Sequence, residues 1–343
     1  MAKRYILKLY LKYFFLILFA LILFFVALDF LQAVKSLPDS ANLKLLYITY
    51  KAFYAIDTLL PITLIFAMIA LKVQLIRSNE LVAFYSLGIG KKEIIKPLFL
   101  SATLITVIYI FLHTTSFAYA NEYAKNIRKF HSLSSVTKNL FFKFNDSYVF
   151  FKELLPLRKM AKEIKIYTLK DDELESITEA ERGYFRQEAW YLKDARVVKN
   201  LKDRIDIRKK DVKTLVGYKP QILDSVYEGK ANITLVDAIY ALKLFKEQKI
   251  DITRIKSVIY ANLFYPFFAP LLLVIIFYFV PVSARISNLN LFTFGAILTS
   301  LIVWGVLFMM VKLAFNGALS PEAAILMPIF LLALVAFYLY KKF

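Results

Sequence analysis

The fold is decided by the first apolar run, residues 13–31, YFFLILFALILFFVALDFL, in which Asp29 is the single charged residue. A helix of this length crosses roughly 30 Å of hydrocarbon. The run is longer than the apolar core of a signal peptide and no A-x-A cleavage site follows it, so we expect it to remain in the protein. Similar runs recur at residues 52–71, 97–117, 258–280, 291–313 and 323–340. We therefore predict an α-helical membrane protein with six transmembrane helices.

The overall composition narrows the function classes. The chain has 343 residues, of which 59% are hydrophobic, a formal net charge of +19, and no cysteine. Its basic residues flank the apolar runs without an RNP, zinc-finger or helix-turn-helix pattern, so the charge indicates membrane orientation and anionic lipid rather than nucleic acid. The missing cysteines exclude disulfides, thiolate metal sites and cysteine nucleophiles.

The distribution of basic residues predicts the topology. Alternating spans place four segments on one side, and all four are basic: Lys3, Arg4, Lys8 and Lys12; Lys72, Arg77, Lys91, Lys92 and Lys96; the loop with Arg285; and Lys341 with Lys342. Because short cytoplasmic loops are rich in lysine and arginine, we predict cytoplasmic termini. The domains are then 1–118 with three helices, 119–256 outside, and 257–343 with three more helices.

The outer region is predicted to be an antiparallel β domain. Residues 121–135 are polar with spaced apolar residues, which predicts a helical extension of the third span. Short alternating stretches follow at residues 141–144, 148–151, 164–169, 189–192 and 205–207, with turn signals such as Asn145-Asp146 and Asp171-Asp172. This pattern is typical of a sandwich or barrel. Between residues 234 and 254 the period becomes helical, with one face formed by Leu235, Ile239, Leu242 and Phe245.

No motif predicts catalysis. Gly88-Ile89-Gly90-Lys91 resembles the end of a phosphate-binding loop, but Tyr85 stands where its first glycine is required and Lys92 where Ser or Thr is required. The two histidines, at positions 113 and 131, have no partners at metal-site spacing. We therefore predict no enzyme, cofactor or metal site.

The segment between the second and third spans carries the most information. A short helix is predicted at about residues 77–88, with Ser78 as its cap, Glu80 in its first turn and Gly88 at its end. Apolar residues, among them Leu81 and Phe84, give this helix a hydrophobic surface. Such a helix either lies on lipid headgroups or docks into a groove of a soluble partner.

A family resemblance favours docking. Glu80-Leu81, Ala83, Gly88 and Pro97 resemble the coupling-helix signature of the LptF/LptG permeases, which belong to the ABC transporter that extracts lipopolysaccharide. The three-plus-three layout, the stretch 235–266, and Asn316-Gly317-Ala318-Leu319-Ser320-Pro321 also resemble this family. The strand Ala189-Trp190-Tyr191-Leu192 and the compact C-terminus are more similar to LptG than to LptF. Gly90, where the family often has Ser or Thr, and the short Arg285 loop depart from the pattern.

The resemblance implies a location, partners and roles. The chain would lie in the inner membrane of a Gram-negative bacterium, with a β-jellyroll-like periplasmic domain. Its partners would be a second LptF/LptG-type permease, a dimeric LptB-like ATPase, an LptC-like bitopic protein and lipopolysaccharide. Glu80, Leu81, Phe84 and Gly88 would form the ATPase-coupling site. Apolar strand residues such as Phe141, Phe142, Val149 and Phe151 would either line a lipid groove or pack in the core of the domain.

Charged residues at the outer ends of the spans allow two interpretations. Lys35, Lys44, Lys51 and Lys312 either snorkel to solvent or meet lipid phosphate, which lysine binds as a point charge. Lys35 matches a substrate-contacting lysine of the family, and Lys51 is the second candidate for phosphate binding. Asp29 and Asp57 are costly in hydrocarbon unless paired, and a pair with Lys35 or Lys51 would satisfy them.

Prolines within the predicted spans indicate kinks. Pro61 and Pro328 each lie inside one span, and Pro266 and Pro270 lie one turn apart in the fourth. Proline removes a helical hydrogen bond and leaves a carbonyl without its partner. Because prolines are common in membrane helices, these kinks alone do not indicate a gate.

Two other functions are alternatives to the permease. A mechanotransmitting ABC subunit of the lipoprotein-release type usually has four spans with the outer domain after the first, which the three-plus-three layout contradicts. A membrane-anchored periplasmic binding module would not need the helix around Glu80. Binding of an ATPase therefore discriminates between the module and the permease.

Overall fold

The computed structural model describes residues 2–134, 136–170, 173–201, 204–227, 233–248, 251–281 and 288–343. The chain forms two units, one made of Met1–Lys35, Ile48–Ala120 and Lys256–Phe343, the other of Ser36–Tyr47 and Asn121–Ile255. The predicted turn at Asp171-Asp172 and the loop with Arg285 lie outside the described residues.

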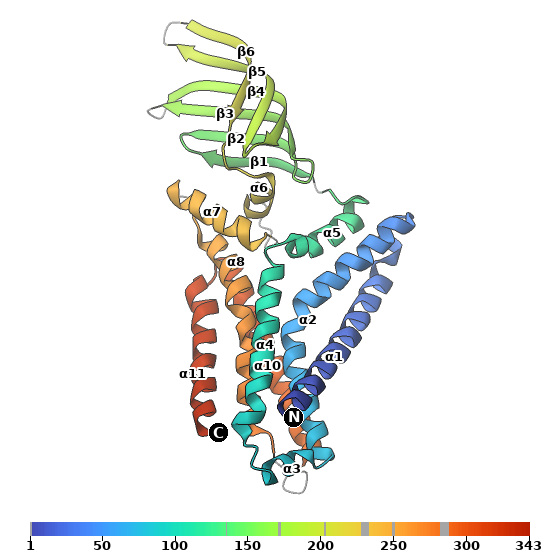
Figure 1. Ribbon diagram of the computed structural model, residues 1–343. Coiled ribbons are helices and arrows are strands. Elements are labelled where there is room, and N and C mark those ends of the chain that lie inside the picture. The colour runs from blue at the N-terminus through green and yellow to red at the C-terminus, as the bar shows by residue number, and fades with distance from the viewer. Residues whose placement is uncertain are drawn as a thin grey trace. The chain divides into compact units, whose positions relative to one another are not determined.

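The first unit is helical, and the described residues contain six helices long and apolar enough to span a membrane. They are α1 (Ala2–Ala33) with η1 (Val34–Ser36), α2 (Ala41–Arg77), α4 (Lys91–Leu112), α8 (Thr253–Leu263) with η3 (Tyr265–Phe267) and α9 (Phe268–Phe279), α10 (Leu289–Phe315), and η4 (Glu322–Leu326) with α11 (Met327–Lys342) (Figure 1). The prediction of six spans is confirmed. The third ends at Leu112, earlier than expected, and the short η2 (Ser116–Tyr119) follows it.

The apolar spans differ in how much of their surface the chain itself covers. In α2 72% of the most apolar window is buried, but in α1 only 6% is. The Tyr10 hydroxyl donates a buried hydrogen bond to the carbonyl of Leu64, which ties α1 to α2. Ser257 donates to the carbonyl of Ala314 in the same way, between α8 and α10. Helix α2 is therefore the centre of this unit, and α1 leaves most of its apolar surface for lipid or another protein.

The prolines have local effects that differ between spans. Helix α2 continues through Pro61, whereas the fourth span changes to a 3₁₀ turn at Pro266 before α9 begins. The sixth span opens with a π-helical turn, Glu322–Leu326, directly before Pro328. A break in regular helix is thus confirmed at Pro266 in the fourth span. In the sixth span the irregular turn lies at the start, before Pro328, and at Pro61 the helix is not interrupted.

The second unit contains one antiparallel sheet of six strands in chain order (Figure 1). The strands are β1 (Thr137–Phe144), β2 (Ser147–Leu155), β3 (Met160–Lys170), β4 (Glu173–Arg186), β5 (Ala189–Leu201) and β6 (Arg204–Thr214). Each pairs with the next, for example Phe142 opposite Val149 and Tyr184 opposite Tyr191. The prediction of an antiparallel β domain is confirmed, and its strand order is that of a meander.

One face of this sheet is covered by its own unit. The indole of Trp190 is fully buried, and its N–H donates to the carbonyl of Tyr218 at 2.8 Å. The Tyr218 ring stacks on Phe142 and contacts Phe245 of α7 (Leu235–Glu247). Helix α6 (Pro220–Tyr227) packs against β1, β2 and α7. These contacts form the hydrophobic core of the second unit.

Several sequence expectations for this unit need adjustment. Strand β4 was not predicted, and α5 (Ala120–Phe130) begins a new helix after η2 rather than extending the third span. In α7 the buried residues are Leu235, Ala238, Ala241 and Phe245, whereas the expected Ile239 is 55% exposed. Of the strand residues proposed for a groove, Phe142, Val149 and Phe151 are buried in the core, and Phe141 is exposed.

Candidate functional site

The helix between the second and third spans, α3 (Glu80–Ser86), is held by its two ends. Its N-cap is Asn79, in a left-handed conformation with φ 58°, while the Ser78 hydroxyl donates back to Gln74 in α2. The expectation that Ser78 caps the helix is therefore wrong. At the other end Gly88, with φ 78°, donates to Tyr85, and Ile89 donates to Phe84. This is a complete Schellman motif, and it confirms Gly88 as the residue that ends the helix.

The two faces of α3 have different environments. Leu81 is fully buried, and the Phe84 ring lies 6.5 Å from the ring of Tyr5 in α1. Burial also raises the pKa of Tyr85 to about 12, and its hydroxyl makes no hydrogen bond within the described residues. Leu87, directly after the helix, is 76% exposed. Leu81 therefore anchors α3 to the chain, and the face near Leu87 remains available to another molecule.

Glu80 lies at the start of α3 and is half-buried. Among the described residues it forms no ion pair, whereas Glu93, the other acid of this segment, lies 3.6 Å from Lys3. Glu80 is thus an acidic side chain at a partly covered position, where a cation of another protein would interact strongly with it.

Asp29 is neutralised inside the helical unit. Its carboxylate lies 2.9 Å from the Lys51 ammonium, and the two side chains are only 22% and 12% exposed. The expectation that Asp29 pairs with Lys35 or Lys51 is therefore confirmed, with Lys51 as the partner. A lipid phosphate at Lys51 would have to compete with this carboxylate. The proposed phosphate role of Lys51 therefore requires that the phosphate displace Asp29 or share the ammonium with it.

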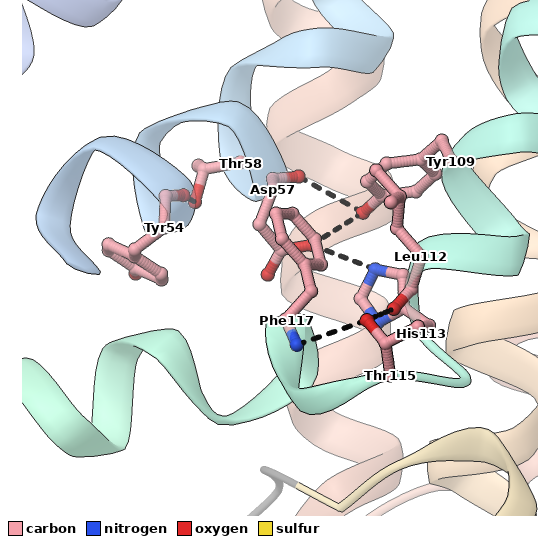
Figure 2. Close-up of polar contacts among 8 residues, drawn as sticks. All are labelled: Tyr54, Asp57, Thr58, Tyr109, Leu112, His113, Thr115 and Phe117. Carbon is pink, nitrogen blue, oxygen red and sulfur yellow. Dashed lines mark hydrogen bonds and ion pairs between the residues drawn. The ribbon is translucent and has the colours of Figure 1, made fainter. Parts of the chain in front are cut away.

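Asp57 finds different partners, which Figure 2 shows. Its Oδ1 lies 2.9 Å from Nε2 of His113 and 2.7 Å from the Tyr109 hydroxyl, so the expected lysine partner is wrong for this acid. The same hydroxyl lies 3.0 Å from the backbone carbonyl of Asp57. That carbonyl is four residues before Pro61 and lacks its helical donor for this reason. The Tyr109 hydroxyl therefore lies within hydrogen-bond distance of two groups: the Asp57 carboxylate, and the Asp57 carbonyl that loses its helical donor to Pro61.

The cluster around Asp57 also fixes the end of α4. The His113 ring is 5% exposed and packs edge-on between Tyr109, at 4.8 Å, and Phe117, at 5.5 Å. Within the described part of the chain its Nε2 makes no regular hydrogen bond, and its contact with Asp57 is the ion-pair approach of 2.9 Å. Asp57 of α2, Tyr109 and His113 at the end of α4, and Phe117 of η2 therefore form one cluster. The polar partners in this cluster explain how an acid is tolerated within a span.

The remaining lysines of interest lie in different settings. Lys35 is exposed in η1 and makes no ion pair among the described residues. Lys44 is half-buried near the start of α2. Lys312 lies 5.0 Å from the ring centre of Phe308 and 5.6 Å from that of Phe315, which is the geometry of a snorkelling side chain. Lys35 is thus the most open of the candidate phosphate contacts.

A comparison with known families settles the classification. The sequence model of the family "Lipopolysaccharide export system permease LptF/LptG" matches residues 4–342. The chain belongs to this family. The LptF/LptG match covers both halves of the helical unit and the inserted sheet, so the resemblance seen in the sequence is confirmed over essentially the whole chain. A comparison with curated proteins finds no match.

Membership defines the function in outline. The LptF/LptG family consists of export permeases, so the chain is a multi-pass membrane protein and a transport subunit rather than an enzyme. The family model describes LptF and LptG together and does not distinguish them. The assignment to the LptG type therefore stays a prediction from the strand Ala189-Trp190-Tyr191-Leu192 and the C-terminus.

Proposed function

We propose that the chain is one permease of an ABC transporter that extracts lipopolysaccharide from the inner membrane and passes it to a periplasmic bridge. The observation that carries this proposal beyond the family match is α3. Buried Leu81 and the turn at Gly88 fix this helix to the bundle, while Glu80 and Leu87 remain partly open. A fixed helix with an open charged and apolar face suits the transmission of force from a docked ATPase.

The chain leaves surfaces uncovered that the proposed partners would fit. Helices α1 and α10 expose large apolar side chains along much of their length, including Phe15, Phe24, Phe294 and Met309. A second permease of the same family and an LptC-like bitopic helix would cover part of this surface. Together the two permeases would enclose a cavity open to lipid, and a dimeric LptB-like ATPase would close it through Glu80, Leu81, Phe84 and Gly88.

The β sheet is suited to extending the path for the lipid. Among the described residues, the outer edges of β1 and β6 are not paired with a further strand. An unpaired edge can accept a strand from another protein. We propose that a like domain adds to one edge, so that the lipid passes from sheet to sheet.

The topology prediction can be tested directly. We propose that both termini are cytoplasmic and that residues 118–256 are periplasmic, as the basic segments indicate. A reporter that is active only in the cytoplasm should then stay silent when it is fused after Lys199 in β5. The same reporter fused after Lys342 serves as the positive control. A strong signal from the Lys199 fusion would contradict the arrangement.

The substrate is tested by purifying the transporter with its lipid. We expect the complex of the two permeases and the ATPase, isolated from cells in mild detergent, to retain lipopolysaccharide that mass spectrometry identifies. The purified complex should also release this lipid from liposomes in an ATP-dependent manner. Recovery of lipoprotein instead, or of an intact complex that extracts no lipopolysaccharide, would contradict the proposal.

Lys35 provides a sharper test of substrate contact. If its ammonium meets a lipid phosphate, Lys35→Glu replaces attraction by repulsion and should lower lipopolysaccharide crosslinking severalfold. Assembly of the complex should not change, because Lys35 is exposed and makes no ion pair among the described residues. Lys138→Glu is the control, because it makes the same charge change at an exposed lysine of β1 that is not a candidate phosphate contact. Equal lipopolysaccharide crosslinking in wild type and Lys35→Glu would mean that Lys35 only snorkels to solvent and does not contact the lipid phosphate.

A further inference from the structure

An apolar groove of about 500 Å³ lies on the helical unit away from the residues discussed so far. Phe99 and Leu100 of α4 form one wall, and Ala333 and Phe337 of α11 form the other. Helix α9 packs against both α4 and α11 and supplies Val274 to the lining. The groove therefore runs between α4 and α11 with α9 as its floor.

One end of this groove is positively charged. Lys96 is part of the lining, near the start of α4, and Tyr340, near the end of α11, is the other polar residue there. The Lys341 ammonium lies 4.6 Å from the ring centre of Phe337, another lining residue. Neither lysine forms an ion pair among the described residues. The groove thus combines an apolar trough with one lysine in its lining, Lys96, and a second, Lys341, beside its lining residue Phe337.

This combination matches one class of molecule. At the end of a span an ammonium group lies among lipid headgroups, and basic pockets between transmembrane helices bind anionic headgroups. The groove continues from this end along the spans, past residues that are exposed to lipid, such as Leu100 and Phe337. A partner helix is about 10–12 Å across with its side chains. This is wide for a groove whose two walls, α4 and α11, both pack against the same helix, α9. A single acyl chain is much narrower.

We propose that the groove between α4 and α11 binds an acyl chain of an anionic glycerophospholipid, with the lipid phosphate at Lys96 and Lys341. The bound lipid is a resident of the permease and is separate from its exported cargo. The inference requires only that these helices span a membrane, so it does not depend on the identity of the transported lipid.

The test uses the full chain, in its complex, reconstituted in phosphatidylcholine nanodiscs. Phosphatidylglycerol with a photoreactive acyl chain is added, and labelled peptides are quantified by mass spectrometry. We expect labels on the segments around Phe99 and Ala333, and much weaker labelling there by phosphatidylcholine with the same chain. Each lysine near an anionic headgroup changes affinity about fivefold. Lys96→Gln should therefore reduce the labelling about fivefold, and the double variant with Lys341→Gln more than tenfold.

Two controls separate this site from general lipid contact. Lys92→Gln removes an exposed charge of the same helix that is not part of the lining, and it should leave the labelling unchanged. Ala333→Phe should fill the trough and abolish labelling, while ATPase binding shows that the complex is intact. Equal labelling by both lipids, insensitivity to Lys96→Gln, displacement by lipopolysaccharide, or crosslinking of the groove to the second permease would each overturn the proposal.

Discussion

Glu80→Lys should weaken binding of the ATPase by roughly 30-fold or more and abolish coupled transport. The carboxylate is half-buried at the start of α3 and has no ion-pair partner among the described residues. Docking would bury it further against a cation or backbone amides of the ATPase. Loss of one partner from a buried charge pair costs about 2–5 kcal/mol, and 1.4 kcal/mol corresponds to a factor of ten in affinity. The lysine adds repulsion to that loss.

Two matched variants make this result interpretable. Glu93→Lys makes the same charge change in the same basic segment, but Glu93 is exposed and pairs with Lys3 over 3.6 Å. Because exposed pairs contribute little, it should bind the ATPase nearly as well as wild type. Tyr5→Phe keeps the ring that lies 6.5 Å from Phe84 of α3, removes only its hydroxyl, and so reports on the positioning of α3 alone. Pull-down of the ATPase and a liposome transport assay measure all three. Equal tolerance of Glu80→Lys and Glu93→Lys would leave Glu80 as a solvated residue at a helix start.

The spans were predictable because the bilayer imposes length and composition on each of them separately. Residues 13–31, for example, need no knowledge of their neighbours to be recognised as a span. The end of the third span was less predictable. Thr114 and Thr115 donate to the carbonyls of Phe111 and Leu112 at the point where α4 ends. Local hydrogen bonds of this kind compete with the helix. A hydropathy pattern contains no information on such bonds, so it could not predict where the helix ends.

Strand β4 shows where the pattern of apolar residues fails. Its buried side comprises Thr178, Ala180, Gly183 and Phe185, which are mostly too small or too polar to produce a hydrophobic alternation. Gly183 is required by close packing, since a Cβ there would lie 2.5 Å from Ile164 and 2.7 Å from Leu192. Small residues at a tight interface are buried as fully as large ones. The face of α7 was mispredicted for the same reason, at Ala238 and Ala241.

The polar partners within the spans depend on tertiary structure. Lys35 and Lys51 could both be named from the sequence as partners for Asp29, because each is a charge near a span end, and the structure pairs Asp29 with Lys51. The spacing of His113 speaks only to a metal site, and the sequence analysis does not predict that His113 is the partner of Asp57. A signal was nevertheless present. Tyr109 and His113 are four residues apart on one helix face, and Pro61 leaves the carbonyl of Asp57 in need of a donor.

Trp190→Ala should destabilise the β domain by about 3–5 kcal/mol, as expected for the removal of a buried tryptophan. The indole is fully buried against Phe151 and Phe185, and its N–H donates to Tyr218. The substitution leaves a cavity at the centre of the core and removes the indole donor from the buried carbonyl of Tyr218. Tyr218 in turn contacts Phe245 of α7, so the helix should lose its anchor as well.

Hydrogen exchange of the full-length protein in detergent measures this effect without isolating the domain. Backbone amides of β2 to β5 should exchange at least about 100-fold faster in Trp190→Ala, because 1.4 kcal/mol of lost stability corresponds to a factor of ten. Tyr191→Ala is the matched control. Tyr191 is the next residue of β5 and points to the opposite, less buried face, so its loss should change exchange by less than tenfold. Equal acceleration in both variants would mean that the sheet does not depend on the core on the Trp190 face, and that its other face is covered to a similar extent.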